Sequence, residues 1–185
     1  MEFTLIQDFP AGIDRLWAVF GRLDYVRRKY RALGATAVRL RRFEATAQAI
    51  EIELERDVPV DPSRLPLWSR PLVGTKQTLR HHTAWRRSGP TQATATLDIS
   101  PQGWPLHARG HATIVEVSPE LTRMRLTWRT KSTLPVIGFM AERLLADQVR
   151  SALDADHAFT LQFLADADAE AGHPQARSRP SGGAE

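Results

Sequence analysis

Histidine is the residue type best suited to chemistry in this chain of 185 residues, which contains six histidines and no cysteine. His107 and His111 lie four residues apart in a segment of alternating residue types, and four residues along a strand span about 13 Å. They cannot bind one metal ion together, because the four-residue histidine spacing of zinc sites requires a helix. The lack of cysteine also excludes a disulfide framework, a thiol nucleophile and cysteine-ligated metals. We therefore predict no metal site and no cofactor.

His81 and His82 are adjacent in a second alternating segment, so their side chains point to opposite faces of the predicted strand. His81 shares a face with Trp85, and we expect this face to be the interior one. Two roles are open to His81. It is either a polar contact for a bound ligand or a hydrogen-bonded interior or rim histidine, which is the commoner fate of a single imidazole.

No recognisable catalytic motif is present. The sequence contains no Gly-x-Ser-x-Gly elbow. Gly74-Thr75-Lys76 resembles the end of a phosphate-binding loop, but the earlier glycine is missing and a strand follows. Glu142 lies near the start of a predicted long helix, where it either stabilises that helix end or hydrogen-bonds a polar ligand group at a cavity mouth. We therefore predict no catalytic residue.

The strands that position these side chains are clearest late in the chain. Residues 106 to 117 and 121 to 131 each alternate and are separated by a short turn centred on Pro119, which predicts a hairpin. The predicted register pairs Ile114 with Met124, Ala112 with Leu126, and Gly110 with Trp128. A tryptophan that faces a glycine is expected to lay its ring over it.

The other face of this hairpin is strongly basic and must be solvated. We call it the basic face, and its members are Arg109, Arg123, Arg125, Arg129 and Lys131. Either neighbouring acidic residues offset this charge or the face binds an anionic partner. The whole chain has 25 basic and 21 acidic residues, a net charge of only +4.

Five further strands are predicted from the same alternation. An early hairpin pairs residues 36 to 43 with 48 to 57, and the predicted register places Val38 opposite Leu54, Leu40 opposite Ile52, Arg39 opposite Glu53 and Arg41 opposite Glu51. Strands are also expected over residues 75 to 87, over 92 to 100 and at the amino terminus, where Phe3, Leu5 and Phe9 alternate. The total is seven strands.

Helices are predicted in two places. Two short helices joined at a bend lie between the first strand and the early hairpin, one capped by Asp14 and the other beginning near Asp24 and ending at Gly34. A single long helix is expected over 137 to 165, and its length requires an extended surface such as a curved sheet beneath it.

One domain, residues 1–165, is predicted, followed by a disordered tail at 166–185 that contains no large apolar residue. The proline-rich segment 58 to 74 is a candidate lid. The amino terminus has no secretory-signal pattern, and no apolar run approaches the roughly 18 residues of a membrane span, so we expect a soluble cytoplasmic protein.

This order of elements resembles the helix-grip fold of the START-like superfamily, to which the major birch pollen allergen and the polyketide cyclases belong. More narrowly, the chain is similar to the domain of unknown function 2505 family. The matching residues are Asp24-Tyr25-Val26, Leu33-Gly34, Pro71-Leu72-Val73-Gly74 ahead of Trp85, Gly103 with Pro105, and Leu134-Pro135-Val136-Ile137-Gly138 leading to Glu142. The chain departs from the family pattern at Phe139 and Met140. The resemblance implies an α+β fold with a cavity between a seven-stranded curved antiparallel sheet and the long helix packed across it.

We therefore expect a protein that binds a hydrophobic or amphipathic small molecule in this cavity. The cavity candidates are His81, Trp85, Leu97, Ile99, Met124, Leu126, Trp128, Met140 and Leu144. One alternative is an interaction module that uses the basic face. The other is a cyclase-like or hydrolase-like enzyme, which would need at least two titratable groups in the cavity, whereas strand parity places His81 there with no evident partner. The sequence leaves the ligand and the oligomeric state open.

Overall fold

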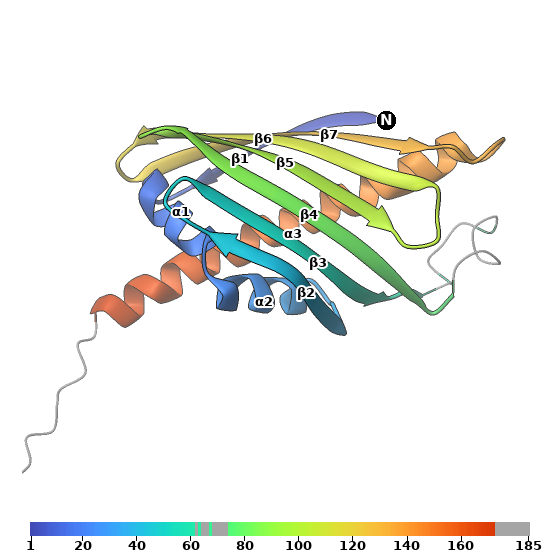
Figure 1. Ribbon diagram of the computed structural model, residues 1–185, viewed down its shortest axis with the longest axis horizontal. Helices are drawn as coiled ribbons and strands as arrows, with labels where there is room; N and C mark the ends of the chain where they lie inside the picture. The colour runs from blue at the N-terminus through green and yellow to red at the C-terminus, as the bar shows by residue number, and fades with distance from the viewer. Residues whose placement is uncertain (62, 64–66, 68–73, 173–185) are drawn as a thin grey trace, which may run out of the picture.

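The computed structural model describes residues 1–61, 63, 67 and 74–172, with side chains to residue 167. Its elements are β1 (Glu2–Phe9), α1 (Ile13–Phe20), α2 (Leu23–Ala32), β2 (Ala37–Ala45), β3 (Ala49–Pro59), β4 (Lys76–Gly89), β5 (Gln92–Pro101), β6 (Leu106–Ser118), β7 (Leu121–Ser132) and α3 (Gly138–Gly172). The strands form one seven-stranded antiparallel sheet in the order β1-β7-β6-β5-β4-β3-β2. The predicted α+β helix-grip architecture is confirmed (Figure 1).

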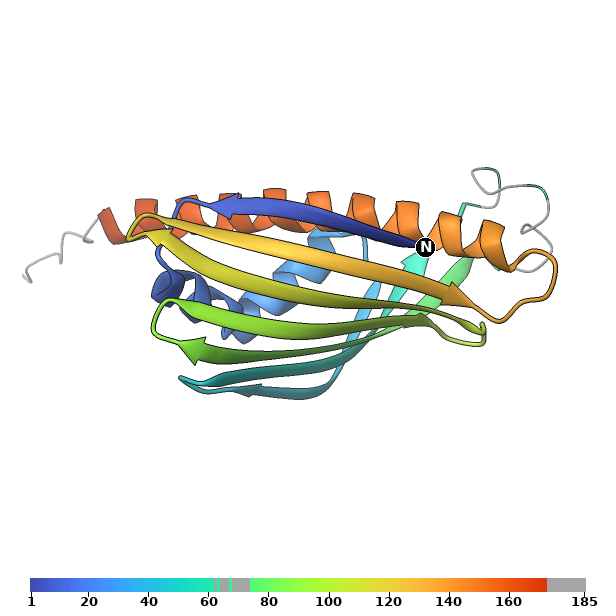
Figure 2. The same ribbon diagram turned by 90° about the horizontal axis from the view of Figure 1, so that it is seen from above.

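The sheet curves around the long helix. Figure 2 shows α3 running the length of the sheet beside β1, with the other strands curving away from it and α1 and α2 on the same concave side. Helix α3 packs on β7, β6 and β1, while α2 packs on both α3 and β2. The helices therefore enclose a space over the inner faces of the middle strands, and the buried apolar core lies there.

The predicted register of the late hairpin is confirmed. Gly110 pairs with Trp128 across β6 and β7, and the neighbouring apolar pairs follow in the expected order. A Cβ atom on Gly110 would lie 2.6 Å from Cε2 of Trp128, so the indole ring does cover the glycine. The tryptophan is 1% exposed, which makes this contact part of the core.

The predicted register of the early hairpin is wrong, by two residues up to Leu40 and by three beyond it. Leu40 pairs with Leu54, and a bulge between Leu40 and Arg42 then places Phe43 opposite Ile52. Up to Leu40 the slip of two residues keeps each side chain on its own face, so apolar alternation cannot distinguish the two registers there. The bulge then brings Phe43 to the core face with Val38 and Leu40. The charge pairs move accordingly, and Arg39 binds Asp57 at 2.6 Å instead of facing Glu53.

The short helices are confirmed, with one change of detail. Helix α1 begins at Ile13, one residue before the predicted cap Asp14, and the carboxylate of Glu116 accepts a hydrogen bond from the Ile13 backbone N–H at 2.7 Å. Gly34 follows α2 with φ of +80°, the left-handed conformation that favours glycine at a helix end.

Helix α3 continues to Gly172, beyond the predicted end at residue 165. Alanine and glutamate are strong helix formers, so the helix continues although its last residues offer no large apolar side chain. The rest of the expected tail, 173–185, and most of the expected lid, residues 62, 64–66 and 68–73, lie outside the described residues. Within the part of the chain that is described, no helix combines the length and apolar character needed to cross a membrane.

Candidate functional site

Two adjoining cavities lie between the concave face of the sheet and α3. The inner cavity, of about 100 Å³, is enclosed by α1, α2, α3 and the inner faces of the strands. The outer cavity, of about 480 Å³, lies under the first half of α3, between the end of β3, the start of β4, the end of β5 and the start of β6. Four residues line both cavities: Arg56, Ile99, Val149 and Ala152. These residues mark the junction at which the two cavities meet.

The structure places most of the predicted cavity residues on these walls. The inner cavity is lined by His81, Trp85, Leu97, Ile99, Met124, Leu126 and Trp128. Leu144 lines the outer cavity. These positions follow from strand parity and from the inward face of α3; their contact with a ligand stays a prediction.

Met140 is the exception. Its side chain is 45% exposed and lines neither cavity. Ala141, Leu145, Ala146 and Val149 are the buried residues of this part of α3, and Ala141, Leu145 and Val149 follow one another at the four-residue spacing of a helix face. This face turns Met140 outward, so the expectation for Met140 is corrected.

Glu142 does not line either cavity, and its carboxylate has its partners near the start of α3 instead. Its Oε1 accepts a hydrogen bond from the Ser132 backbone N–H at 3.0 Å, and its Oε2 lies 2.9 Å from the amino group of Met1. These contacts lower the pKa of Glu142, chiefly through the amino group and then through Ser132. The carboxylate therefore joins the start of α3 to the end of β7, and it lines neither cavity.

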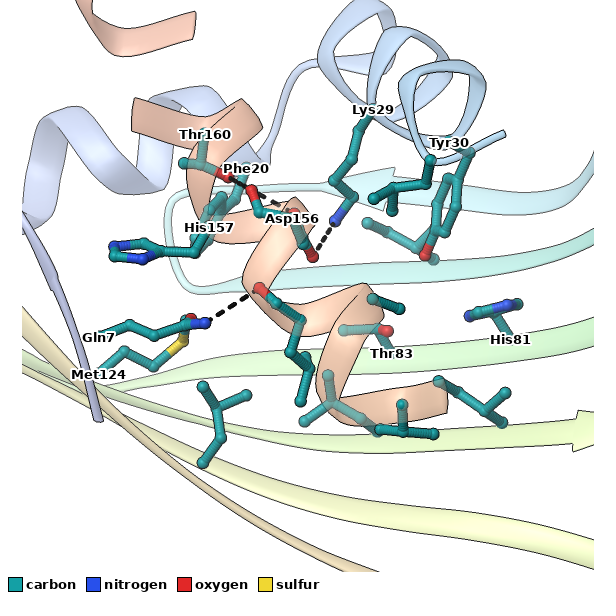
Figure 3. Close-up of a pocket in the computed structure, with 18 of the residues that line it drawn as sticks. Gln7, Phe20, Lys29, Tyr30, His81, Thr83, Met124, Asp156, His157 and Thr160 are labelled. Carbon is teal, nitrogen blue, oxygen red and sulfur yellow. Dashed lines mark hydrogen bonds and ion pairs between the residues drawn. The ribbon is translucent and has the colours of Figure 1, made fainter. Parts of the chain in front are cut away.

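A polar cluster that the sequence analysis missed crosses the inner cavity. Lys29 on α2 donates to Asp156 on α3 at 3.2 Å, and the hydroxyl groups of Tyr25 and Thr160 lie 2.7 Å apart. Figure 3 shows Lys29 reaching across to Asp156, with Thr160 close by on the same helix. Asp156 and Thr160 are four residues apart, as are Tyr25 and Lys29, so each pair lies on one helix face. This four-residue spacing is visible in the sequence and could have indicated that each pair shares a helix face.

Burial and the neighbouring groups have opposite effects on the pKa of Lys29. Burial lowers its pKa, but the attraction of Asp156, followed by that of Tyr25 and Tyr30, outweighs burial and raises the pKa above its ordinary value. The ammonium also lies 5.2 Å from the centre of the Tyr30 ring. Lys29 therefore stays charged, and Asp156 is its partner.

His81 has a partner, contrary to the expectation from strand parity. The Nε–H of Arg56 donates to Nε2 of His81 at 2.9 Å, and both side chains are 6% exposed. The Tyr30 ring meets the His81 ring edge-on at 5.2 Å. His81 is thus a hydrogen-bonded interior histidine that also lines the inner cavity.

Burial, followed by the charges of Arg56 and Lys29, lowers the pKa of His81 well below its ordinary value. The imidazole is therefore neutral, as its acceptor role at Nε2 requires. The sequence analysis did not identify Arg56 as a cavity residue, although the alternation along β3 indicates that it points inward. It follows Ile50, Ile52 and Leu54 at alternate positions of β3, so it continues an otherwise apolar inward face.

The described start of the candidate lid forms part of the outer cavity. Val58, Pro59, Val60 and Asp61 line it, and Trp104 lies on the same wall. Oδ1 of Asp61 accepts hydrogen bonds from the Ser63 backbone N–H and hydroxyl group. Most of the remainder of 58–74 lies outside the described residues, so its role as a lid stays a prediction.

The basic face lies on the outside of the sheet, as expected, and all five of its members are exposed. Three of them have acidic partners: Arg109 with Asp98 at 3.1 Å, Arg123 with Asp8 at 2.8 Å and Arg129 with Glu2 at 2.7 Å. Much of the charge of this face is therefore offset by its neighbours.

Comparison with solved structures shows the same architecture in other proteins. A START superfamily protein from Mycobacterium smegmatis has a TM-score of 0.52 at 12% identity, over 88% of this chain and 98% of that chain. The Zhui aromatase/cyclase from Streptomyces sp. R1128 has a TM-score of 0.58 at 14% identity, over 100% of this chain and 99% of that chain. Ara h 8.0201 has a TM-score of 0.51 at 10% identity, over 88% of this chain and 98% of that chain. At such identities these likenesses show the fold.

The sequence comparisons give the family. No curated protein matches the chain. Residues 4–164 match the family described as "Protein of unknown function (DUF2505)", a match that spans most of β1, all of β2 to β7 and most of α3. With this match and its START-like helix-grip fold, the chain belongs to the DUF2505 family.

Proposed function

We propose that this protein binds a hydrophobic or amphipathic small molecule in the two adjoining cavities between its sheet and α3. The main support for this proposal is the outer cavity. Its volume of about 480 Å³ falls in the range of roughly 300–1,000 Å³ that is typical of small-molecule sites. Its wall is mainly apolar, with a few polar side chains such as Arg56, Gln77 and Gln148. That combination suits a molecule with an apolar body and a polar end.

The inner cavity supports the same function in a different way. It is smaller, and its helix-side wall is polar where Lys29 and Asp156 meet. These two groups are engaged with each other, and His81 is engaged with Arg56. The apolar body of a ligand is therefore best accommodated in the outer cavity, with its polar end toward the junction.

The rival hypothesis, an interaction module that binds through the basic face, has less support than cavity binding. Exposed ion pairs each contribute little, but they reduce the positive potential that an anionic partner would meet. With Arg109, Arg123 and Arg129 already paired, the cavity is the stronger candidate site.

Native mass spectrometry of the protein purified from its own host tests the proposal. We expect an adduct of one small molecule that disappears on denaturation, and organic extraction then identifies its chemical class. The same protein, once stripped of this adduct, is expected to bind the neutral dye Nile red saturably.

A matched pair of variants locates the binding. Ala152→Phe adds a ring at the junction of the cavities, whereas Ala155→Phe makes the same change at an exposed position of α3. The ring of A152F occupies space that the dye would fill, so A152F is expected to weaken Nile red by about tenfold, or about 1.4 kcal/mol, while A155F binds like the wild type. Equal dye affinity in all three proteins, with no adduct, would refute cavity binding.

A further inference from the structure

Arg56 is a buried cation with no carboxylate partner in the described part of the chain. It is 6% exposed, and its one hydrogen bond runs from Nε to the neutral ring of His81. Its guanidinium also lies 5.3 Å from the centre of the Tyr30 ring. Neither contact carries a negative charge. A buried charge is normally paired, because removing it from water is costly, so Arg56 departs from the usual rule.

The other charged groups of this region do have partners. Lys29 binds Asp156 at 3.2 Å. Asp57, which neighbours Arg56 on the opposite face of β3, binds both Arg39 and Lys76. Asp61 lies on the outer cavity wall but is engaged by Ser63 and does not pair with Arg56. Arg56 is attracted by Asp156, but that carboxylate is paired with Lys29, so among the described residues Arg56 has no ion-pair partner of its own where the two cavities meet.

The hydrogen bond to His81 determines which part of Arg56 is available. An arginine offers five N–H groups in a planar fork, and His81 takes the one on Nε. The four N–H groups on the two terminal nitrogens make no hydrogen bond within the described chain, and Arg56 lines both cavities. Two terminal nitrogens side by side match the two oxygens of a carboxylate.

From this arrangement we propose that the ligand is an amphipathic carboxylic acid whose carboxylate binds the terminal nitrogens of Arg56 at the junction, with its apolar body in the outer cavity. This inference rests on the cavity-binding function proposed above. One unpaired cation favours a monoanion over a phosphate dianion. The outer wall around Leu79, Leu106, Leu144 and Leu145 supplies apolar surface for the body of the molecule.

Three probes that share one alkyl chain test this inference: decanoate, decanol and decylamine, each used to displace Nile red below its micelle concentration at neutral pH. We expect decanoate to displace the dye on the order of 10- to 100-fold more effectively than decanol, because a hydrogen-bonded charge pair is worth that much. Decylamine is expected to be the weakest, because it places a second cation beside Arg56.

Variants identify the residue responsible. Arg56→Gln is expected to abolish the advantage of decanoate over decanol while leaving decanol unchanged, and Arg56→Lys to retain part of it. Arg125→Gln makes the same change on the exposed outer face and is expected to behave as the wild type. If R56Q does not fold, the carboxyl NMR signal of bound decanoate in the wild type decides. A bound pKa below that of free decanoate supports pairing with Arg56, and a raised one contradicts it.

The possible failures are distinguishable. If Nile red binds and decanol displaces it as well as decanoate does, or if R56Q keeps the preference for decanoate, the carboxylate inference is overturned while cavity binding stands. If neither the dye nor any of the three probes binds, cavity binding itself is refuted, and the inference with it.

Discussion

Replacing Gly110 by alanine tests the closest contact behind the cavity wall. The added Cβ would lie 2.6 Å from Cε2 and 2.8 Å from Cδ2 and Cζ2 of Trp128, distances at which the ring has to move. The indole is 1% exposed, so it can move only against other core side chains or into the inner cavity of about 100 Å³ that it lines. Overpacking of this kind costs about 1–3 kcal/mol.

A smaller effect opposes this cost. Replacing glycine by alanine restricts the unfolded chain and stabilises the native state by about 0.4–1 kcal/mol where the backbone permits it. Gly110 has no positive φ, so this gain applies. The expected result is a net loss of about 1–2 kcal/mol in the free energy of unfolding, or a fall in Tm of roughly 2–4 °C per kcal/mol.

Urea unfolding with an unchanged m-value measures this loss. Gly89→Ala is the control, because a Cβ at Gly89 meets nothing within 4 Å, and we expect no loss of stability there. In a Trp128→Leu background, G110A is expected to lose most of its cost, since the indole that the methyl group meets is gone. The reasoning is refuted if G110A is as harmless as G89A, or if its cost is the same with and without Trp128.

Three further predictions concern charged and polar groups. Asp156→Asn leaves the Lys29 ammonium without its partner and is expected to lower the free energy of unfolding by about 1.5–3 kcal/mol, whereas Asp154→Asn, at an exposed position of the same helix, changes it little. The pKa of His81 is lowered in the native state, so below the ordinary value of about 6.5 the unfolded chain binds a proton that the native state does not, and stability falls with acidity by up to about 1.4 kcal/mol per pH unit from this group. His81→Gln, whose amide oxygen can still accept from Arg56, is expected to remove that component. Arg123→Gln breaks an exposed ion pair and is expected to cost no more than about 1 kcal/mol, a cost that salt reduces.

Each of these has a contrary result that urea titrations can reveal. Equal stability of D156N and D154N would show that Asp156 does not compensate Lys29. A wild type and an H81Q variant with parallel pH profiles between pH 7 and 5 would show that His81 does not titrate on unfolding. A large, salt-independent loss in R123Q would show that the ion pair of the basic face is more than a surface contact.

The strands were predictable because their signal is local. Alternation of residue types assigns each side chain to a face, and a turn of three residues leaves little freedom, so the register of β6 and β7 follows from residues close in sequence. Between β2 and β3 the alternation up to Leu40 is satisfied by two registers, and the bulge after Leu40, which alternation does not predict, shifts the pairing by one more residue. The apolar wall of the cavity was predicted for the same reason, since Trp85, Leu97, Leu126 and Trp128 occupy inward positions of their strands.

The polar part of the site was not predictable in this way. Lys29 and Asp156 are 127 residues apart and meet only because α2 and α3 pack on each other. Arg56 and His81 lie on neighbouring strands, and their contact depends on the pairing of β3 with β4. The face of Arg56 could be read from alternation, but a single arginine at an inward position is uninformative until its surroundings are known.

By itself, the sequence determined the order of the elements, the faces of most strand residues, the late hairpin and the apolar inward positions beneath a long helix. These properties are set by residues that are near one another in the chain, through side-chain alternation and turn length. The tertiary structure alone decided the volumes of the two cavities, the outward position of Met140, the pairing of Lys29 with Asp156 and the unpaired charge of Arg56 within the described chain. Those properties depend on how distant elements pack and on which charges they bring into contact.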